Sequence, residues 1–203
     1  MLKDEVISMG QEAPDTADRM LDVAERLVQT VGFNGFSYAD IAAELEITKA
    51  SLHYHFATKA ALGAKLVSRY HENFVAALER IRRAPSDVPH KLRDYTALYS
   101  GVLRKNRMCL CGMLASDFAT LPKPMQKGVR EFFDANESWL AAILEEGRAA
   151  KTLAYAGPAA VIAQMIVSSL EGAMMVARSF NDVARFDTAA TRLLDGLVAA
   201  KHR

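Results

Sequence analysis

The chain has 203 residues, of which 51% are hydrophobic and 24% are charged, and its formal net charge at pH 7 is +1. This length and composition fit a soluble protein with an ordinary surface, either one large domain or a small head with a larger body. No apolar run reaches the roughly 18 residues needed to span a bilayer, and the acidic start does not resemble a signal peptide, so we expect a cytoplasmic protein with reduced cysteines.

The first expected helix follows an N-terminal tail at residues 1–14. Asp15 or Thr16 can cap this helix, and Gly32 can end it, because glycine readily takes the left-handed conformation that often follows a helix. Its apolar residues recur at helical spacing and predict one buried face. These residues are Met20, Ala24, Leu27, Val28 and Val31. We expect this helix to be the first of three in a small head domain over residues 15–62.

Two short helices separated by a tight turn are predicted next. Ser37 stands three residues before Asp40, the spacing of a capping box, so a helix begins near Tyr38. Thr48 can cap the following helix, which begins at Lys49. The residues that can pack between the two helices are Ile41, Ala42, Leu45, Leu52 and Phe56. This pattern, over about residues 38–56, predicts a helix-turn-helix, which places its second helix in the DNA major groove.

The run from Ile41 to Leu62 resembles the DNA-binding domain of the TetR-like (tetracycline repressor, TetR/AcrR) family. Members commonly have IA, a short turn, and then S/T-K-x-x-L-Y-x-H-F-x-x-K-x-x-L. The residues that carry the resemblance are Thr48, Lys49, Leu52, Tyr54, His55, Phe56, Lys59 and Leu62. The resemblance implies a three-helix DNA-binding head followed by a helical body that binds an effector and forms dimers.

Two residues depart from the family pattern. Glu46 occupies a turn position that is usually glycine, and a left-handed backbone there would cost about 1 to 2 kcal/mol. His53 replaces the aromatic residue that usually follows Leu52, which affects the expected base preference and not the fold.

Side chains that face away from the packed side of the helix-turn-helix are the predicted DNA contacts. Lys49, Ser51 and His53 are expected at base edges. The residues expected at phosphates are Thr48, Tyr54, His55 and Lys59. The full predicted set is Ser37, Tyr38, Thr48, Lys49, Ala50, Ser51, His53, Tyr54, His55 and Lys59. The head is otherwise rich in acidic residues, so we expect two copies to be required for useful affinity.

The rest of the chain, residues 63–203, predicts helices and no alternating strand pattern. Thr58 can cap a long helix over 59–83 whose buried stripe includes Tyr70 and Phe74, and Pro85 and Pro89 break the chain after it. Further helices are expected at about 87–105, 109–120, 123–149, 158–179 and 188–200. The expected fold class is therefore all-α, with about nine helices.

The helix expected at 158–179 is apolar almost all round, and a helix of this kind must be buried on most of its surface. The last helix, at 188–200, carries a further apolar set that includes Ala189, Leu193 and Val198. In the resembled family, the last two helices form a four-helix interface with those of a second copy, so we expect a homodimer. The alternative is a monomeric core.

Both cysteines lie in one segment, at Cys109 and Cys111. Partners for a structural zinc site are missing and residues two apart on a helix point to opposite sides, so we predict no metal site and no disulfide there. Arg104, Lys105 and Arg107 precede Cys109, and nearby cations lower the pKa of a thiol. The segment is similar to that of a TetR-like subgroup that includes sensors of electrophiles and oxidants. Cys109 is thus a candidate sensor, and the alternative is a plain core cysteine.

A pocket for a small apolar effector is expected between the helices of the body. Its predicted lining is Tyr95, Tyr99, Cys109, Met113, Phe118, Phe132, Phe133, Trp139 and Met165. The alternative for each of these residues is a place in the hydrophobic core.

No catalytic triad and no glycine-rich phosphate loop is present, so the sequence predicts neither an enzyme nor a cofactor. We expect a homodimeric repressor that binds a near-palindromic operator in double-stranded DNA. An effector or modification of Cys109 would release it by favouring another conformation. The alternative is a helical carrier of an apolar metabolite that does not act on DNA.

Overall fold

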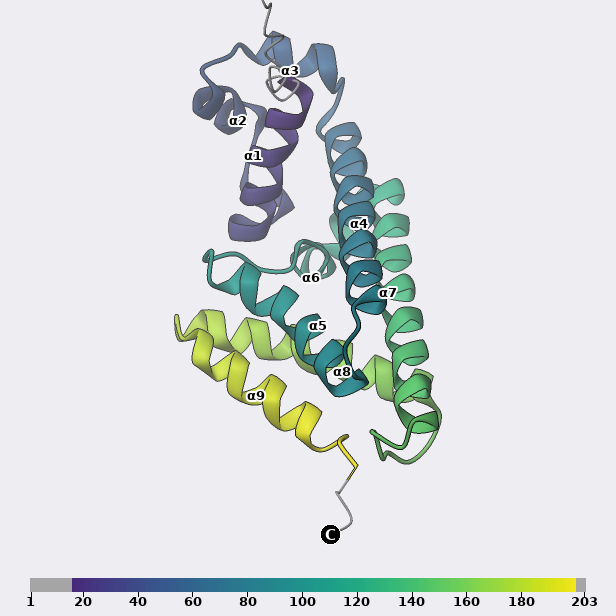
Figure 1. The fold of residues 1–203 in the computed structure, drawn as a ribbon. Coiled ribbons are helices and arrows are strands. Elements are labelled where there is room, and N and C mark those ends of the chain that lie inside the picture. The colour runs from purple at the N-terminus through teal and green to yellow at the C-terminus, as the bar shows by residue number, and fades with distance from the viewer. Residues whose placement is uncertain (1–15, 200–203) are drawn as a thin grey trace, which may run out of the picture.

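The computed structural model describes residues 16–199, and the predicted tail at 1–14 lies outside them. Within this range the chain forms nine α-helices, two short 3-10 helices and no strand, apart from one isolated bridge between Leu153 and Val198. The all-α prediction is confirmed. Figure 1 shows a small head of α1 to α3, a long α4 that leads away from it, and a body of the remaining helices.

The head consists of α1 (Thr16–Val31), the short helix η1 (Phe33–Gly35), α2 (Tyr38–Leu45) and α3 (Lys49–His55). Gly32 ends α1 as predicted, with φ 81° and ψ 167°, a positive φ that favours glycine but not the left-handed helical conformation. Ser37 and Asp40 form the predicted capping box at the start of α2. The apolar faces of the three helices meet in one core, in which Met20, Ile41 and Leu52 are fully buried.

Helix α4 (Lys59–Arg83) joins the head to the body and lies along α7 (Lys123–Ala149) (Figure 1). Two glycines allow these helices to approach closely. A Cβ at Gly63 would lie 2.4 Å from Met125 Sδ, and a Cβ at Gly128 would lie 2.7 Å from a Val67 methyl carbon. Any larger residue would therefore push the two helices apart.

The other body elements are α5 (Val88–Leu103), α6 (Leu110–Ser116), η2 (Phe118–Thr120), α8 (Ala159–Ser179) and α9 (Val183–Asp195). The predicted start of the last helix at about 188 is wrong, because Asp182 caps it earlier by accepting a hydrogen bond from Ala184 N at 3.0 Å. It also ends before 200: Leu197 and Ala199 instead form backbone hydrogen bonds with the segment that follows α7.

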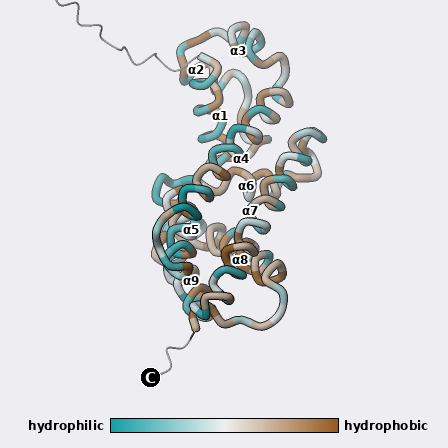
Figure 2. Tube along the Cα trace, turned by 45° about the vertical axis from the view of Figure 1, so that its right-hand side comes forward, coloured by the Kyte–Doolittle hydropathy of each residue, from teal (hydrophilic) through white to brown (hydrophobic). Residues whose placement is uncertain are grey.

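Helix α8 is the most apolar of the long helices in the described chain, and hydrophobic residues prevail along its tube in Figure 2, with hydrophilic ones between them. By length and composition alone, it could cross a membrane. One side of it packs on α7 and α9, and its opposite side leaves several large apolar side chains exposed. The excess of apolar surface that the sequence predicts for this helix is therefore present.

The turn of the helix-turn-helix contains a strained residue. Glu46 follows α2 with φ 56° and ψ 39°, the left-handed conformation expected for the glycine that the family usually has there. Its backbone N–H bonds the carbonyl oxygens of Ala42 and Ala43, which fixes this geometry.

We expect Glu46→Gly to raise the free energy of unfolding by about 1 kcal/mol, because glycine takes this conformation without the steric cost of a Cβ. Glu46→Ala retains the Cβ and is the matched control, for which little change is expected. Urea unfolding followed by circular dichroism measures both. A Glu46→Gly protein that is less stable than the wild type would show that the strain is not relieved.

Candidate DNA-binding surface and effector cavity

Helix α3 is anchored by one side and presents the other to solvent. Leu52 and the following Phe56 are buried in the core of the head, while Thr48 caps the helix by accepting a hydrogen bond from Ser51 N at 3.2 Å. Lys49 is exposed, and Tyr54 is 87% exposed, which is unusual for an aromatic side chain. An exposed tyrosine and an exposed lysine on a well-anchored helix are suited to contacts with DNA.

Several other predicted contacts also lie at this surface. Ser37, Ala50 and His53 are exposed, while Ser51 and His55 are partly exposed. The ring of His53 is less free than expected, because its Nδ1 lies 3.2 Å from the carbonyl oxygen of Ala57 and its centroid lies 4.9 Å from that of Tyr38.

Two predicted DNA contacts face inward instead. The Tyr38 side chain is buried, and its hydroxyl donates to the carbonyl of Phe56 at 2.8 Å. The Lys59 ammonium donates to the carbonyls of Phe33 and Phe36 and lies 4.6 and 4.2 Å from the centres of their rings. Burial lowers the pKa of Lys59. Both residues therefore hold the head together, and we correct their predicted role as DNA contacts.

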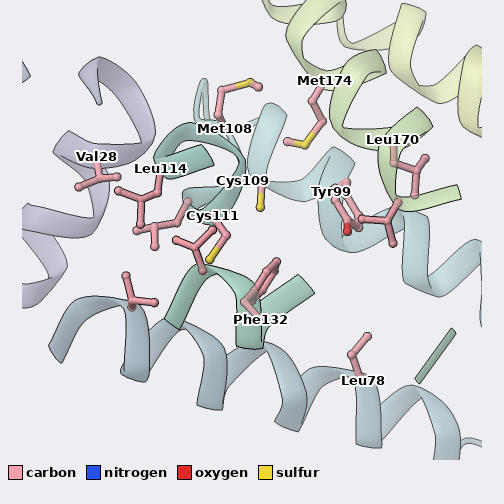
Figure 3. Packing of buried hydrophobic residues seen from close by; sticks show 14 of the residues in the cluster. Val28, Leu78, Tyr99, Met108, Cys109, Cys111, Leu114, Phe132, Leu170 and Met174 are labelled. Carbon is pink, nitrogen blue, oxygen red and sulfur yellow. The ribbon is translucent and has the colours of Figure 1, made fainter. Parts of the chain in front are cut away.

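A cavity of about 190 Å³ lies where the head meets the body. Helices α1, α4, α5 and α8 and the residue before α6 form its walls, and Figure 3 shows Tyr99, Cys109 and Met174 approaching one another from three of these segments. The lining residues are Glu25, Tyr70, Asn73, Phe74, Ala77, Leu98, Tyr99, Val102, Cys109 and Met174.

Only Tyr99 and Cys109 of the predicted lining belong to this cavity. The buried Tyr95 donates to Asn136 Oδ1 at 2.9 Å, and Asn136 Nδ2 donates to the Tyr99 hydroxyl at 2.9 Å, so Tyr95 serves a polar network in the core. The other predicted residues lie elsewhere. Phe132 and Trp139 are buried in the core, Phe133, Met113 and Phe118 are partly buried, and Met165 is 44% exposed on α8.

The lowered pKa that the sequence predicts for Cys109 is not found. Cys109 precedes α6 as expected, and Gly112 N donates to its sulfur at 3.5 Å, but the side chain is only 3% exposed. Burial and the nearby carboxylate of Glu171 raise the pKa of the thiol. The three preceding cations do not offset this: Lys105 is exposed, Arg104 pairs with Asp187 at 2.9 Å, and Arg107 acts on Glu25.

Glu171 lies on α8 behind the thiol. Burial raises its pKa to about 7, and its buried Oε1 has no hydrogen-bond partner among the described residues. A Cβ at residue 112 would clash with the Glu171 carboxyl group, so only glycine leaves room for it there.

We expect Cys109 and Cys111 of the native protein to react with 5,5′-dithiobis(2-nitrobenzoate) at pH 7.5 more than tenfold slower than glutathione, because the thiolate is the reactive form and burial disfavours it. Both thiols should react rapidly in urea, which is the internal control. The Cys109→Ser variant assigns the reacting thiol, and rapid reaction of Cys109 in the native protein would contradict the raised pKa.

A three-helix head with a helix-turn-helix, joined by one long helix to an all-helical body, defines a class of bacterial DNA-binding regulators. The sequence matches the family of bacterial regulatory proteins called the tetR family over residues 20–65, and the tetracyclin repressor-like C-terminal domain over residues 89–193. The chain belongs to the TetR family. It is a transcriptional regulator with a DNA-binding head and a ligand-binding body.

Solved structures agree with this membership. The chain is similar to a TetR-family regulator from Agrobacterium tumefaciens, at 34% identity and a TM-score of 0.87, with 90% of this chain and 97% of that chain covered. It is also similar to a TetR transcriptional regulator from Legionella pneumophila, at 32% identity and a TM-score of 0.84, with 92% of this chain and 99% of that chain covered. Reduced NemR from E. coli shares the fold at 20% identity, with a TM-score of 0.80 and coverage of 93% and 100%. No curated protein matches the sequence.

Proposed function

We propose that the protein is a homodimeric, cytoplasmic, non-enzymatic repressor that binds a near-palindromic operator. The observation that carries this proposal is the outer face of α3, where Lys49 and the 87% exposed Tyr54 stand free of the head's core. In a dimer, two such helices enter successive major grooves, about 34 to 36 Å apart. Lys49, Ser51 and His53 face bases, and Thr48, Tyr54 and His55 contact phosphates.

The exposed face of α8 supports dimerisation. Val161, Met165, Met175, Val176 and Phe180 are between 44% and 60% exposed on or just after this helix. Several large apolar side chains exposed along one helix are typical of an interface. The last helix offers fewer apolar side chains to a partner, since Leu194 and Leu197 are buried within the chain and Leu193 is partly buried, while Ala189 and the following Val198 are exposed.

The cavity between head and body is the site where a small molecule can favour one position of the head over another. Its walls come from α1 of the head and from α4, α5 and α8, so a ligand there contacts both parts of the chain. Such a ligand changes operator affinity only through a difference in its own affinity for the two conformations. Because Cys109 is a buried wall of the cavity, we favour reversible binding over modification of its thiol.

An electrophoretic mobility shift with the DNA upstream of the protein's own gene tests the proposed repressor. A retarded band that is competed by the same fragment and not by unrelated DNA is expected. Failure to shift this fragment or any other would favour a carrier of apolar molecules that does not act on DNA.

A further inference from the structure

One acidic side chain reaches the otherwise largely apolar cavity between head and body. Tyr70, Phe74 and Tyr99 supply aromatic walls, and Glu25 of α1 lines the same space. The Glu25 side chain is 23% exposed, so its carboxylate has lost most of its contact with water. Aromatic rings around a partly buried carboxylate are a combination that attracts organic cations, since both the ring faces and the carboxylate are electrostatically negative.

The charges around Glu25 leave this end of the cavity short of positive charge. Arg69 of α4 is shared among three carboxylates of α1: it lies 3.3 Å from Glu25, 2.8 Å from Asp22 and 3.7 Å from Asp18. The further cation that acts on Glu25 is Arg107. Three carboxylates therefore face two guanidinium groups, and burial raises the pKa of Glu25 despite the opposing effect of Arg69.

We propose that this cavity binds a small arylalkylamine, with its protonated nitrogen against Glu25 and its ring between Tyr70, Phe74 and Tyr99. The size fits, because an apolar cavity of about 150 Å³ admits benzene and this one measures about 190 Å³. The proposal specifies the effector class of the repressor proposed above and rests on that function.

Because of the position of Glu25, such a ligand can affect the orientation of the DNA-binding head. Glu25 belongs to α1, the first helix of the DNA-binding head, whereas Phe74 and Tyr99 belong to α4 and α5. An amine that pairs with Glu25 competes with Arg69, whose contacts with Glu25, Asp22 and Asp18 link α1 to α4. Binding thus weakens one of the links that set the angle between the head and the long helix.

Isothermal titration calorimetry of the full-length protein, without DNA, tests the proposal with three probes of similar size. We expect benzylamine to bind at least about tenfold more tightly than neutral benzyl alcohol, and phenylacetate to bind more weakly than either. Glu25→Gln should lower the affinity for benzylamine about tenfold and leave that for benzyl alcohol unchanged. Glu72→Gln removes an exposed carboxylate of α4 that does not line this cavity, and it should change neither affinity.

A second variant locates the site if Glu25→Gln fails to fold. Ala77→Phe fills the cavity from the α4 side without altering a charge, and it should abolish benzylamine binding. Binding that persists in Ala77→Phe, equal affinity of wild type and a folded Glu25→Gln for benzylamine, tighter binding of the alcohol or the acid, or no binding of any probe would overturn the proposal.

The operator shift is measured separately so that the two proposals fail independently. Benzylamine binding by a protein that shifts no DNA would leave the amine site in place and refute the repressor. An operator shift by a protein that does not bind benzylamine would refute only the amine site.

Discussion

Replacing Lys49 and Tyr54 together by alanine is expected to lower operator affinity at least about 100-fold. Both side chains are exposed on the outer face of α3 and have no hydrogen bond or ion pair within the described chain, so their removal costs the head little. A contact with a charged phosphate contributes about 1.5 to 3 kcal/mol, and a dimer loses each contact twice. Fluorescence anisotropy with a labelled operator, at one fixed salt concentration, measures the change.

Lys127→Ala is the matched control for this experiment. It removes the same charge from an exposed position on α7, where Lys127 forms only a surface ion pair with Glu131 at 3.4 Å. Its operator affinity should equal that of the wild type. Light scattering must show that both variants remain dimers, and an unchanged affinity of the double variant would refute the assignment of α3 as the recognition helix.

Local sequence patterns were sufficient for much of the fold. The capping box of Ser37 and Asp40, the cap at Thr48 and the stop at Gly32 each involve residues within a few positions of one another, and the structure confirms all three. The left-handed backbone at Glu46 is the conformation of the glycine usual in the family, and no local pattern predicts it for a glutamate. Caps and turns depend on neighbouring residues, so the sequence contains the information they require.

Local sequence patterns did not predict the environment of the charged and reactive groups. Lys59 matches a motif position and was expected at phosphates, yet its ammonium bonds two carbonyls that precede it by 26 and 23 residues. The pKa of Cys109 was expected to follow from the adjacent cations, but burial and Glu171 of α8 decide it. Both outcomes depend on packing between helices, which the local pattern does not specify.

Most of the cavity lining was not predicted, for the same reason. Tyr70 and Phe74 were correctly expected on the inner stripe of the long helix, but nothing in the sequence indicated that Glu25 of α1 would join them. Helical periodicity predicts which face of a helix is turned inward. It does not show where two inward faces leave space between them.

A substitution on the exposed face of α8 is expected to have the second large effect, on dimerisation. We expect Met175→Asp to raise the dissociation constant of the dimer at least about 100-fold, because the side chain is 58% exposed in one chain and would be buried between two. Burying an unpaired carboxylate costs several kcal/mol, and a twofold interface contains the change twice. Sedimentation velocity over a range of concentrations measures the dissociation constant.

Ala76→Asp, at an exposed position of α4, introduces the same charge outside the proposed interface and should leave the dimer intact. Met175→Asp should remain folded as a monomer and bind the operator weakly, because one head alone makes few contacts with phosphates. The adjacent Met174 lines the cavity while Met175 faces outward, so α8 connects the cavity with the proposed dimer face. A Met175→Asp protein that remained a dimer at nanomolar concentrations would place the interface elsewhere and remove this connection.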